Sequence, residues 1–215
     1  FAEGRHGDNA AVTYIPVAAN GSTVVKRPWT WWFAWGLWGA FVVLITATVI
    51  IDATTVSRQE EGESLTSDIG IVIAFSAFAT VGALVASRLP RNAVGWLFLA
   101  SPLFGTVAGF SAEYAYRAYV TDPGSIPAGS LFGWLYLWTW FPALIAIGLV
   151  VLLFPNGRVP GRRWRPLLWA YVAFSVLGVG GAAIYPGPID EEWPGKPQNP
   201  LGVDGLKEAL DLASG

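Results

Sequence analysis

Five uncharged, strongly apolar stretches constrain this chain more than any other feature of its sequence. They cover residues 28–51, 69–87, 93–112, 130–154 and 166–185. A helix rises 1.5 Å per residue, so about 20 residues cross a hydrocarbon layer roughly 30 Å thick. Lipid offers no partners to backbone N–H and C=O groups, and runs of this length must therefore be helical inside a membrane. The sequence predicts an all-α, polytopic membrane bundle of five transmembrane helices.

Composition agrees with a membrane protein and suggests three regions. Charged residues make up only 13% of the 215 residues, whereas soluble domains carry about 25%. We divide the chain into an N-terminal segment (1–27), the five-helix domain (28–185) and a Pro/Gly tail (186–215), whose end is a short amphipathic helix from about residue 204. Because the chain begins with Phe1 and contains no methionine, we expect it to be part of a longer polypeptide.

The positions of the basic residues predict the orientation, because Lys and Arg accumulate in cytoplasmic loops. With alternating crossings, nine of the 13 basic residues share one side: Arg5, Lys26, Arg27, Arg88, Arg91, Arg158, Arg162, Arg163 and Arg165. The other side holds four: Arg58, Arg117, Lys196 and Lys207. We therefore expect a multi-pass protein of the plasma membrane with a cytoplasmic N-terminus and a tail outside the cell.

The loop between the fourth and fifth runs combines turn residues with arginines, in the stretch LLFPNGRVPGRRWRPLLW. Asn156-Gly157 is a turn dipeptide that should end the fourth helix, and Pro166 suits the first turn of the fifth. We interpret the loop's arginines as an anchor in the anionic cytoplasmic leaflet, at about 1 kcal/mol each. A docking surface for a cytoplasmic partner is the alternative. These arginines are Arg158, Arg162, Arg163 and Arg165.

Several kinds of chemistry are excluded by the residues that are missing. There is no cysteine for disulfides, thiolate metal sites or iron–sulfur clusters. The single histidine, His6, lies outside every apolar run, so we predict no cofactor and no transmembrane haem, whose axial ligands are usually His. A net charge of −2 gives no reason to expect a nucleic-acid partner. No P-loop, HExxH or dinucleotide motif indicates catalysis.

The outer end of the third run carries the best candidate for a functional surface, FSAEYAYRAY. Glu113 and Arg117 are four residues apart and so can pair along one helix face, beside Tyr114 and Tyr116. We interpret these residues either as an interfacial ion pair in a tyrosine belt or as an outer sensing or partner surface. A transporter is a weaker hypothesis, because transporters often place charges at mid-membrane depth and every predicted span centre is uncharged.

The first run is rich in tryptophan. Trp31, Trp35 and Trp38 share one helix face at i, i+4, i+7 spacing. An aromatic belt at the headgroup level is the first interpretation, and a helix-packing stripe against a partner helix or a lipid is the second.

Three stretches in order resemble a known family. SRLPRNAVGWLFLA (residues 87–100) resembles an R-x-P-x-N-x-V-G-W-L helix entry, and LLFPNGRVPGRRWRPLLW (152–169) resembles an L-F-P-[DN]-G-R-x-P-x-x-R-W-R-P loop. YPGPID followed by NPLGVDGL completes the order. The combination resembles the N-terminal membrane region of bacterial two-component sensor histidine kinases. This resemblance implies signal transduction at the bacterial inner membrane by a region without catalytic residues of its own.

The chain also departs from that family. It contains no phosphoacceptor histidine region, asparagine box or glycine-rich ATP lid. Five crossings leave the C-terminus outside, so a cytoplasmic kinase module would require a further crossing after residue 215. The alternative function is a non-catalytic structural or accessory subunit of a larger membrane complex. The expected partners are lipids and other transmembrane helices, in a homodimer or in that larger complex.

Overall fold

The structure, a computed structural model, describes residues 28–54, 65–203 and 205. These residues form five long helices: α1 (Trp29–Thr54), α3 (Leu65–Arg88), α4 (Ala93–Tyr116), α5 (Gly129–Leu153) and α6 (Arg165–Ile184). A π-helical turn, η1 (Arg117–Thr121), extends α4, and a 3₁₀ turn, η2 (Arg162–Trp164), precedes α6. All five helices are long and apolar enough to cross a membrane. The prediction of an all-helical fold with five such helices is therefore confirmed.

Some predictions fall outside the described residues. They are the N-terminal segment 1–27 with its basic residues, Arg58 in the first loop, and the amphipathic helix from about residue 204 with Lys207.

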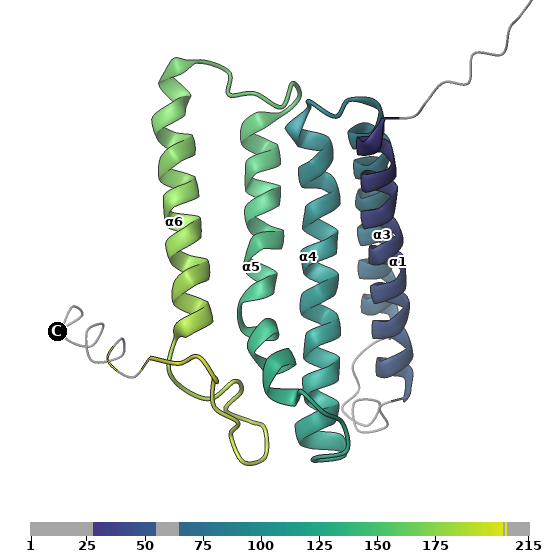
Figure 1. The fold of residues 1–215 in the computed structure, drawn as a ribbon, viewed down its shortest axis with the longest axis vertical. Coiled ribbons are helices and arrows are strands. Elements are labelled where there is room, and N and C mark those ends of the chain that lie inside the picture. Colours follow the sequence, from purple (N-terminus) through teal and green to yellow (C-terminus); the bar gives the residue numbers. More distant parts are fainter. Residues whose placement is uncertain (1–27, 55–64, 204, 206–215) are drawn as a thin grey trace, which may run out of the picture.

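Consecutive helices run antiparallel, so the connections alternate between the two ends of the bundle (Figure 1). The α3–α4 turn and the α5–α6 loop lie at the upper end, together with the start of α1. The α4–α5 loop and the tail after α6 lie at the lower end. All described arginines except Arg117 therefore share one end, as the sequence predicted.

The third helix is longer than predicted. We expected it to end at residue 112, before the charged Glu113, but α4 continues to Tyr116 and its π turn to Thr121. The Asp122-Pro123-Gly124 sequence, where the chain leaves the helix, supplies the first strong helix breakers. A charged residue does not end a helix, and Glu113 consequently lies inside the membrane-length segment Ala93–Thr121.

The main core lies between α1, α3 and α4 and uses small side chains. Its buried residues are Ala34, Phe41, Ala79, Ala83, Ala86 and Leu99. On the same face of α3, Gly82 lies so close to α4 that an added Cβ would overlap the backbone nitrogen of Leu99. Small residues of this kind let helix backbones approach in lipid, where van der Waals contact supplies much of the association energy.

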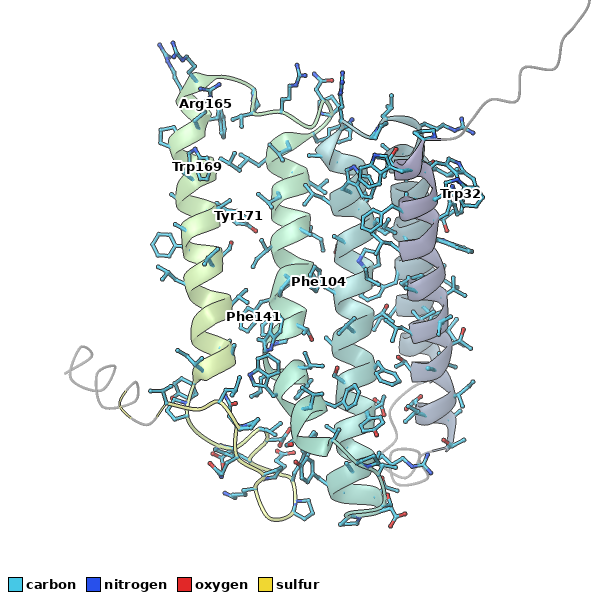
Figure 2. The ribbon with its side chains drawn as sticks, in the orientation of Figure 1. Trp32, Phe104, Phe141, Arg165, Trp169 and Tyr171 are labelled. Atoms are coloured by element: carbon cyan, nitrogen blue, oxygen red, sulfur yellow. The ribbon has the colours of Figure 1, made fainter. Side chains whose placement is uncertain are left out.

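Polar side chains connect the helices in pairs. Trp38 Nε1 donates to Thr80 Oγ1 at 3.1 Å, joining α1 to α3. Ser101 Oγ donates to the Ala143 carbonyl at 3.0 Å, joining α4 to α5. The Tyr171 hydroxyl, which points from α6 toward α5 in Figure 2, donates to the Ile145 carbonyl at 3.2 Å.

The helix α6 lies at the edge of the bundle. It packs against α5, and none of its most apolar 18-residue window is buried. Trp169 is 66% exposed. In a membrane, lipid or a partner helix must cover this surface, because water does not reach it.

Candidate functional site

A crevice between α1, α3 and α4, in the half of the bundle predicted to be outermost, is the best candidate site in the described part of the chain. Its volume is about 200 Å³. The wall is mostly apolar and is completed by polar residues from two helices; its lining residues are Ile45, Thr48, Val49, Asp52, Ile71, Val72, Phe75, Gly105, Thr106, Gly109 and Glu113. Two glycines of α4 line the crevice: an added Cβ on Gly105 would come within 2.6 Å of the Phe75 ring of α3, and one on Gly109 within 3.8 Å of Thr48 Cγ2 of α1.

The spacing of the polar residues of α4 places them on the helix face that lines the crevice. Thr106, Gly109 and Glu113 lie at i, i+3 and i+7, which places them on one helix face. Seven residues span about 10 Å along the axis. Glu113 at 7% exposure and Thr106 at 3% are both buried.

Within the described structure, Thr106 and Thr30 each have a buried hydroxyl without a hydrogen-bond partner, unlike other threonines of the bundle. Five of them, Thr46, Thr48, Thr54, Thr80 and Thr139, donate their hydroxyl to the carbonyl four residues earlier. The buried hydroxyl of Thr106 makes no hydrogen bond within the described structure. Leaving such a group unsatisfied costs about 1–3 kcal/mol, so it is an available partner for a bound molecule.

Oxygen ligands in the crevice come from two carboxylates, Asp52 on α1 and Glu113 on α4. The described residues contain no group of three or more His, Asp or Glu that could hold a metal ion.

The four residues predicted to form one outer surface have different neighbours in the structure. They are Glu113, Arg117, Tyr114 and Tyr116. Glu113 faces the crevice, whereas Arg117 Nη1 donates to Thr54 Oγ1 of α1 at 3.5 Å. No salt bridge joins Glu113 to Arg117 among the described residues, so the predicted pair is not formed. The reason is packing, because α1 lies beside this end of α4 and offers Arg117 another partner.

The two tyrosines also separate. The Tyr114 hydroxyl donates to the Pro127 carbonyl at 2.9 Å, in the α4–α5 loop. Tyr116 is buried at 8% exposure in a cluster with Ala115, Ile189 and Trp193. Tyr116 is therefore covered by the tail and is not part of an open surface.

The first part of the tail forms an ordered structure, which we call the outer cap (residues 186–203). Trp193 is 8% exposed and stacks on Tyr136 of α5, with ring centroids 6.2 Å apart and planes at 18°. The same ring contacts Tyr116 and Tyr119 of the α4 segment. The outer cap thus bridges α4 and α5 at their lower ends, as the yellow loop in Figure 1 shows.

Asn199 holds the outer cap against the end of α6. Its Nδ2 donates to the carbonyls of Ala183 at 3.1 Å and Tyr185 at 2.8 Å, and its Oδ1 accepts from Leu201 N. At the surface of the cap, Lys196 Nζ donates to Glu191 Oε2 at 2.8 Å, and this bond raises the pKa of Lys196 above its usual 10.5.

The sequence predicts this part of the tail only as a Pro/Gly coil, and the structure adds the outer cap. The available signal was Trp193, a large aromatic among prolines, glycines and charges, and Asn199 beside Pro200. Neither signal identifies the distant helices that the cap contacts.

At the other end, two loops meet in what we call the inner junction. Asn92 begins α4, and its Oδ1 accepts from Val94 N at 3.0 Å as an N-cap. Its Nδ2 donates to the Pro155 carbonyl at 3.3 Å. Gly157, with φ +69°, lies so close that a Cβ would overlap Asn92 Oδ1. A hollow of about 850 Å³ beside the junction is lined by residues that include Arg88, Arg91 and Arg158.

The arginines proposed as a leaflet anchor are exposed at this same end. Arg158, Arg162, Arg163 and Arg165 all lie between α5 and the start of α6, and Figure 2 shows Arg165 at the tip of α6. Their contact with lipid stays a prediction.

Part of the tryptophan stripe is used inside the chain. Trp35 and Trp38 are partly buried against the main core, and Trp31 contacts Trp35 with ring centroids 6.1 Å apart. Trp32 points away from the bundle in Figure 2 and is 66% exposed. Two of the three tryptophans of the stripe, Trp35 and Trp38, therefore pack against the core of this chain.

Comparison with known proteins adds no family to these observations. No family model, curated protein or solved structure matches the chain.

Proposed function

We propose that this chain is the membrane-embedded sensory region of a bacterial sensor histidine kinase and carries no catalytic residues itself. The observation that supports the proposal is the location of the three stretches on which the resemblance rests. Two of them meet at the inner junction through Asn92 and Pro155. The third forms the two ends of the outer cap, on either side of Trp193, which contacts Tyr116 and Tyr136. All three act on the same helix pair, α4 and α5.

Such an arrangement suits signal transfer across a membrane. The helices α4 and α5 pack along their length and share the buried hydrogen bond from Ser101 to Ala143. A stimulus that changes the packing at the outer cap would shift α4 relative to α5. The shift would change the inner junction, where the loops face the predicted cytoplasmic side. Small helix displacements of this kind are a common switching motion, and the stimulus acts by favouring one of two packings.

The alternative, a non-catalytic subunit of a larger complex, is supported by α6. Phe174, Val176 and Leu177 are 65–78% exposed. Partner helices seated on this face would make α6 the attachment site. Under this alternative the native chain would purify with other proteins in fixed ratio.

The first test uses the native polypeptide, isolated from membranes with an affinity tag. The kinase proposal predicts a mass well above the 23.0 kDa of this sequence and ATP-dependent labelling with an acid-labile, base-stable phosphate, as expected for phosphohistidine. A mass near 23.0 kDa with stoichiometric partner proteins and no labelling would reject the kinase in favour of the subunit.

The second test asks whether the outer cap influences the kinase. In Trp193→Ala, the loss of ring contacts with α4 and α5 should change the autophosphorylation rate by at least about fivefold, the lower end of typical coupling energies. Trp29→Ala is the control, because Trp29 is 73% exposed on α1. Equal rates in both variants and the parent would contradict transmission through α4 and α5.

A further inference from the structure

Three arginines from two separate loops line one hollow at the inner junction. Arg88 and Arg91 lie at the α3–α4 turn, and Arg158 lies in the α5–α6 loop. The hollow of about 850 Å³ is within the size range of ligand pockets, roughly 300–1,000 Å³. Because Asn92 donates to the Pro155 carbonyl, the fold holds these two basic loops together.

No acidic side chain in these loops balances the positive charge. Residues 84–98 and 148–172 contain no Asp or Glu. Within the described structure, the side chains of Arg88, Arg91 and Arg158 form no hydrogen bond or salt bridge. Asn92, the N-cap of α4, also lines the hollow, and the positive end of that helix adds to the attraction for an anion. The hollow therefore fits an anion whose oxygens accept paired guanidinium hydrogen bonds, such as phosphate.

An apolar groove between α5 and α6 adjoins the hollow. Pro160 lines both spaces, and the groove has a volume of about 340 Å³. Along α5 the groove extends from Phe154 to Gly148, about 9 Å. Tyr171, which points from α6 toward α5 in Figure 2, lies at the Gly148 end. The side chains that line the groove include Val151, Leu152, Phe154, Trp164, Leu167 and Tyr171.

The groove indicates the source of the phosphate. In a membrane, the ends of membrane-length helices lie at the level of the lipid headgroups, so the hollow would meet headgroups and the groove would meet acyl chains. A free phosphate ion could fill the hollow but not the groove. A phospholipid carries both parts, and basic pockets beside transmembrane helices are known to hold anionic headgroups.

We propose that the hollow and the groove together bind one anionic phospholipid whose headgroup carries two phosphates. One phosphate binds Arg88 and Arg91, the other binds Arg158, and an acyl chain lies between α5 and α6. Two phosphates suit this site because its arginines come from two loops. The binding does not rest on the proposed function, since it requires neither a kinase module nor a stimulus.

The probe is radiolabelled tetraoleoyl diphosphatidylglycerol, added to the tagged full chain on scintillation beads in detergent. We expect saturable binding of one lipid per chain. Unlabelled dioleoylphosphatidylglycerol, which has one phosphate, should compete about fivefold or more weakly, as expected for the loss of one contact with a basic residue. Zwitterionic dioleoylphosphatidylcholine should compete more weakly still. Competition by either lipid equal to that of unlabelled diphosphatidylglycerol, or no saturable binding, would overturn the proposal.

Inorganic phosphate is the second competitor, used in large excess at constant ionic strength. It should leave the lipid bound, because it cannot occupy the groove. Displacement of the lipid by inorganic phosphate would identify a site for the free ion and would overturn the proposal.

Arginine variants separate a specific site from general attraction to anionic lipid. Arg91→Gln combined with Arg158→Gln removes one charge from each loop and should weaken binding about 25-fold, or about fivefold for each residue. Arg162→Gln combined with Arg163→Gln is the matched control, because it removes the same charge from exposed residues that do not line the hollow. The control should bind within about twofold of the parent, since charges outside the site are screened. Equal losses in the two double variants would show diffuse attraction and would overturn the proposal.

Val151→Trp tests the acyl chain by filling the groove. Val151 is 77% exposed and lines the groove, whereas Val176 on α6 is 65% exposed and does not line it. Val151→Trp should weaken lipid binding at least about twofold through lost packing, and Val176→Trp should bind like the parent. All these substitutions are at exposed positions, and size-exclusion profiles would verify that the variants fold. Parent-like binding in Val151→Trp would overturn the placement of the acyl chain.

Discussion

At the scale of single residues, the inner junction depends on a glycine and an asparagine that lie 65 positions apart. Gly157 adopts φ +69°, and its backbone N–H donates to the Leu153 carbonyl at 2.9 Å, closing the end of α5. The missing side chain leaves the space that Asn92 occupies. Gly157 therefore both caps the end of α5 and allows the contact between the two loops.

Gly157→Ala should destabilise the protein through both effects. The left-handed backbone alone costs about 1–2 kcal/mol for a residue with a Cβ, and the overlap with Asn92 adds to that cost. The apparent unfolding temperature in detergent should therefore fall by several degrees, since 1 kcal/mol corresponds to about 2–4 °C at this chain length.

Gly161→Ala is the matched control in the same loop. Its φ is −175°, which any residue adopts, and an added Cβ has nothing within 4 Å. The control should melt like the parent. If both variants melt alike, Gly157 does not have the role described here.

Residue-scale features were predictable where they act locally. The Asn156-Gly157 turn and Pro166 in the first turn of α6 are both confirmed, because turn propensity and proline geometry depend on neighbouring backbone. The bond from Asn92 to Pro155 was not predictable, since it joins residues 63 positions apart.

At the scale of elements, close packing of α3 on α4 is the main determinant of the core. Gly82 and Gly95 lie at this crossing, and an added Cβ on Gly95 would come within 2.7 Å of Ala86 N. The helices are apolar all round, so periodicity does not indicate which face packs.

Gly82→Ala should separate α3 from α4, because the new methyl would overlap backbone atoms, which cannot rotate away. Overpacking of this kind costs about 1–3 kcal/mol, measured again as a lower apparent unfolding temperature in detergent.

Gly70→Ala, on the same helix, has open space around the new Cβ. It should be neutral or slightly stabilising, because alanine is the better helix former by up to about 1 kcal/mol. A Gly82→Ala protein as stable as Gly70→Ala would show that the crossing tolerates a wider separation.

The C-terminal end of α4 is the helix boundary that the sequence predicted incorrectly. The predicted end at residue 112 excludes Glu113, because a charge is costly in lipid, but the helix continues and buries Glu113 in the crevice that it forms with α1 and α3. The buried position of Glu113 depends on the packing of three helices, which the sequence alone does not reveal.

At the scale of the whole molecule, the antiparallel order brings the described arginines other than Arg117 to one end (Figure 1). The positive-inside rule then predicts that this end is cytoplasmic. The absence of cysteine from the sequence makes the prediction simple to test with single introduced cysteines.

Gly161→Cys in the α5–α6 loop should react with a membrane-impermeant maleimide only after the cells are opened, whereas Ser125→Cys in the α4–α5 loop should react in intact cells. Both positions are exposed. The opposite labelling pattern would invert the topology and remove the basis for a cytoplasmic signalling end.

The sequence by itself determined the number of membrane-length helices among the described residues and most of their ends, because helix length, proline geometry and turn propensity are properties of short segments. The tertiary structure decided which faces meet: the inner junction, the outer cap and the crevice between α1, α3 and α4 all join segments that are distant in the chain. In apolar helices the pattern that would identify a packing face is weak. The faces that pack together are instead selected by close contacts between glycines and neighbouring backbone. The few polar groups that need hydrogen-bond partners also contribute.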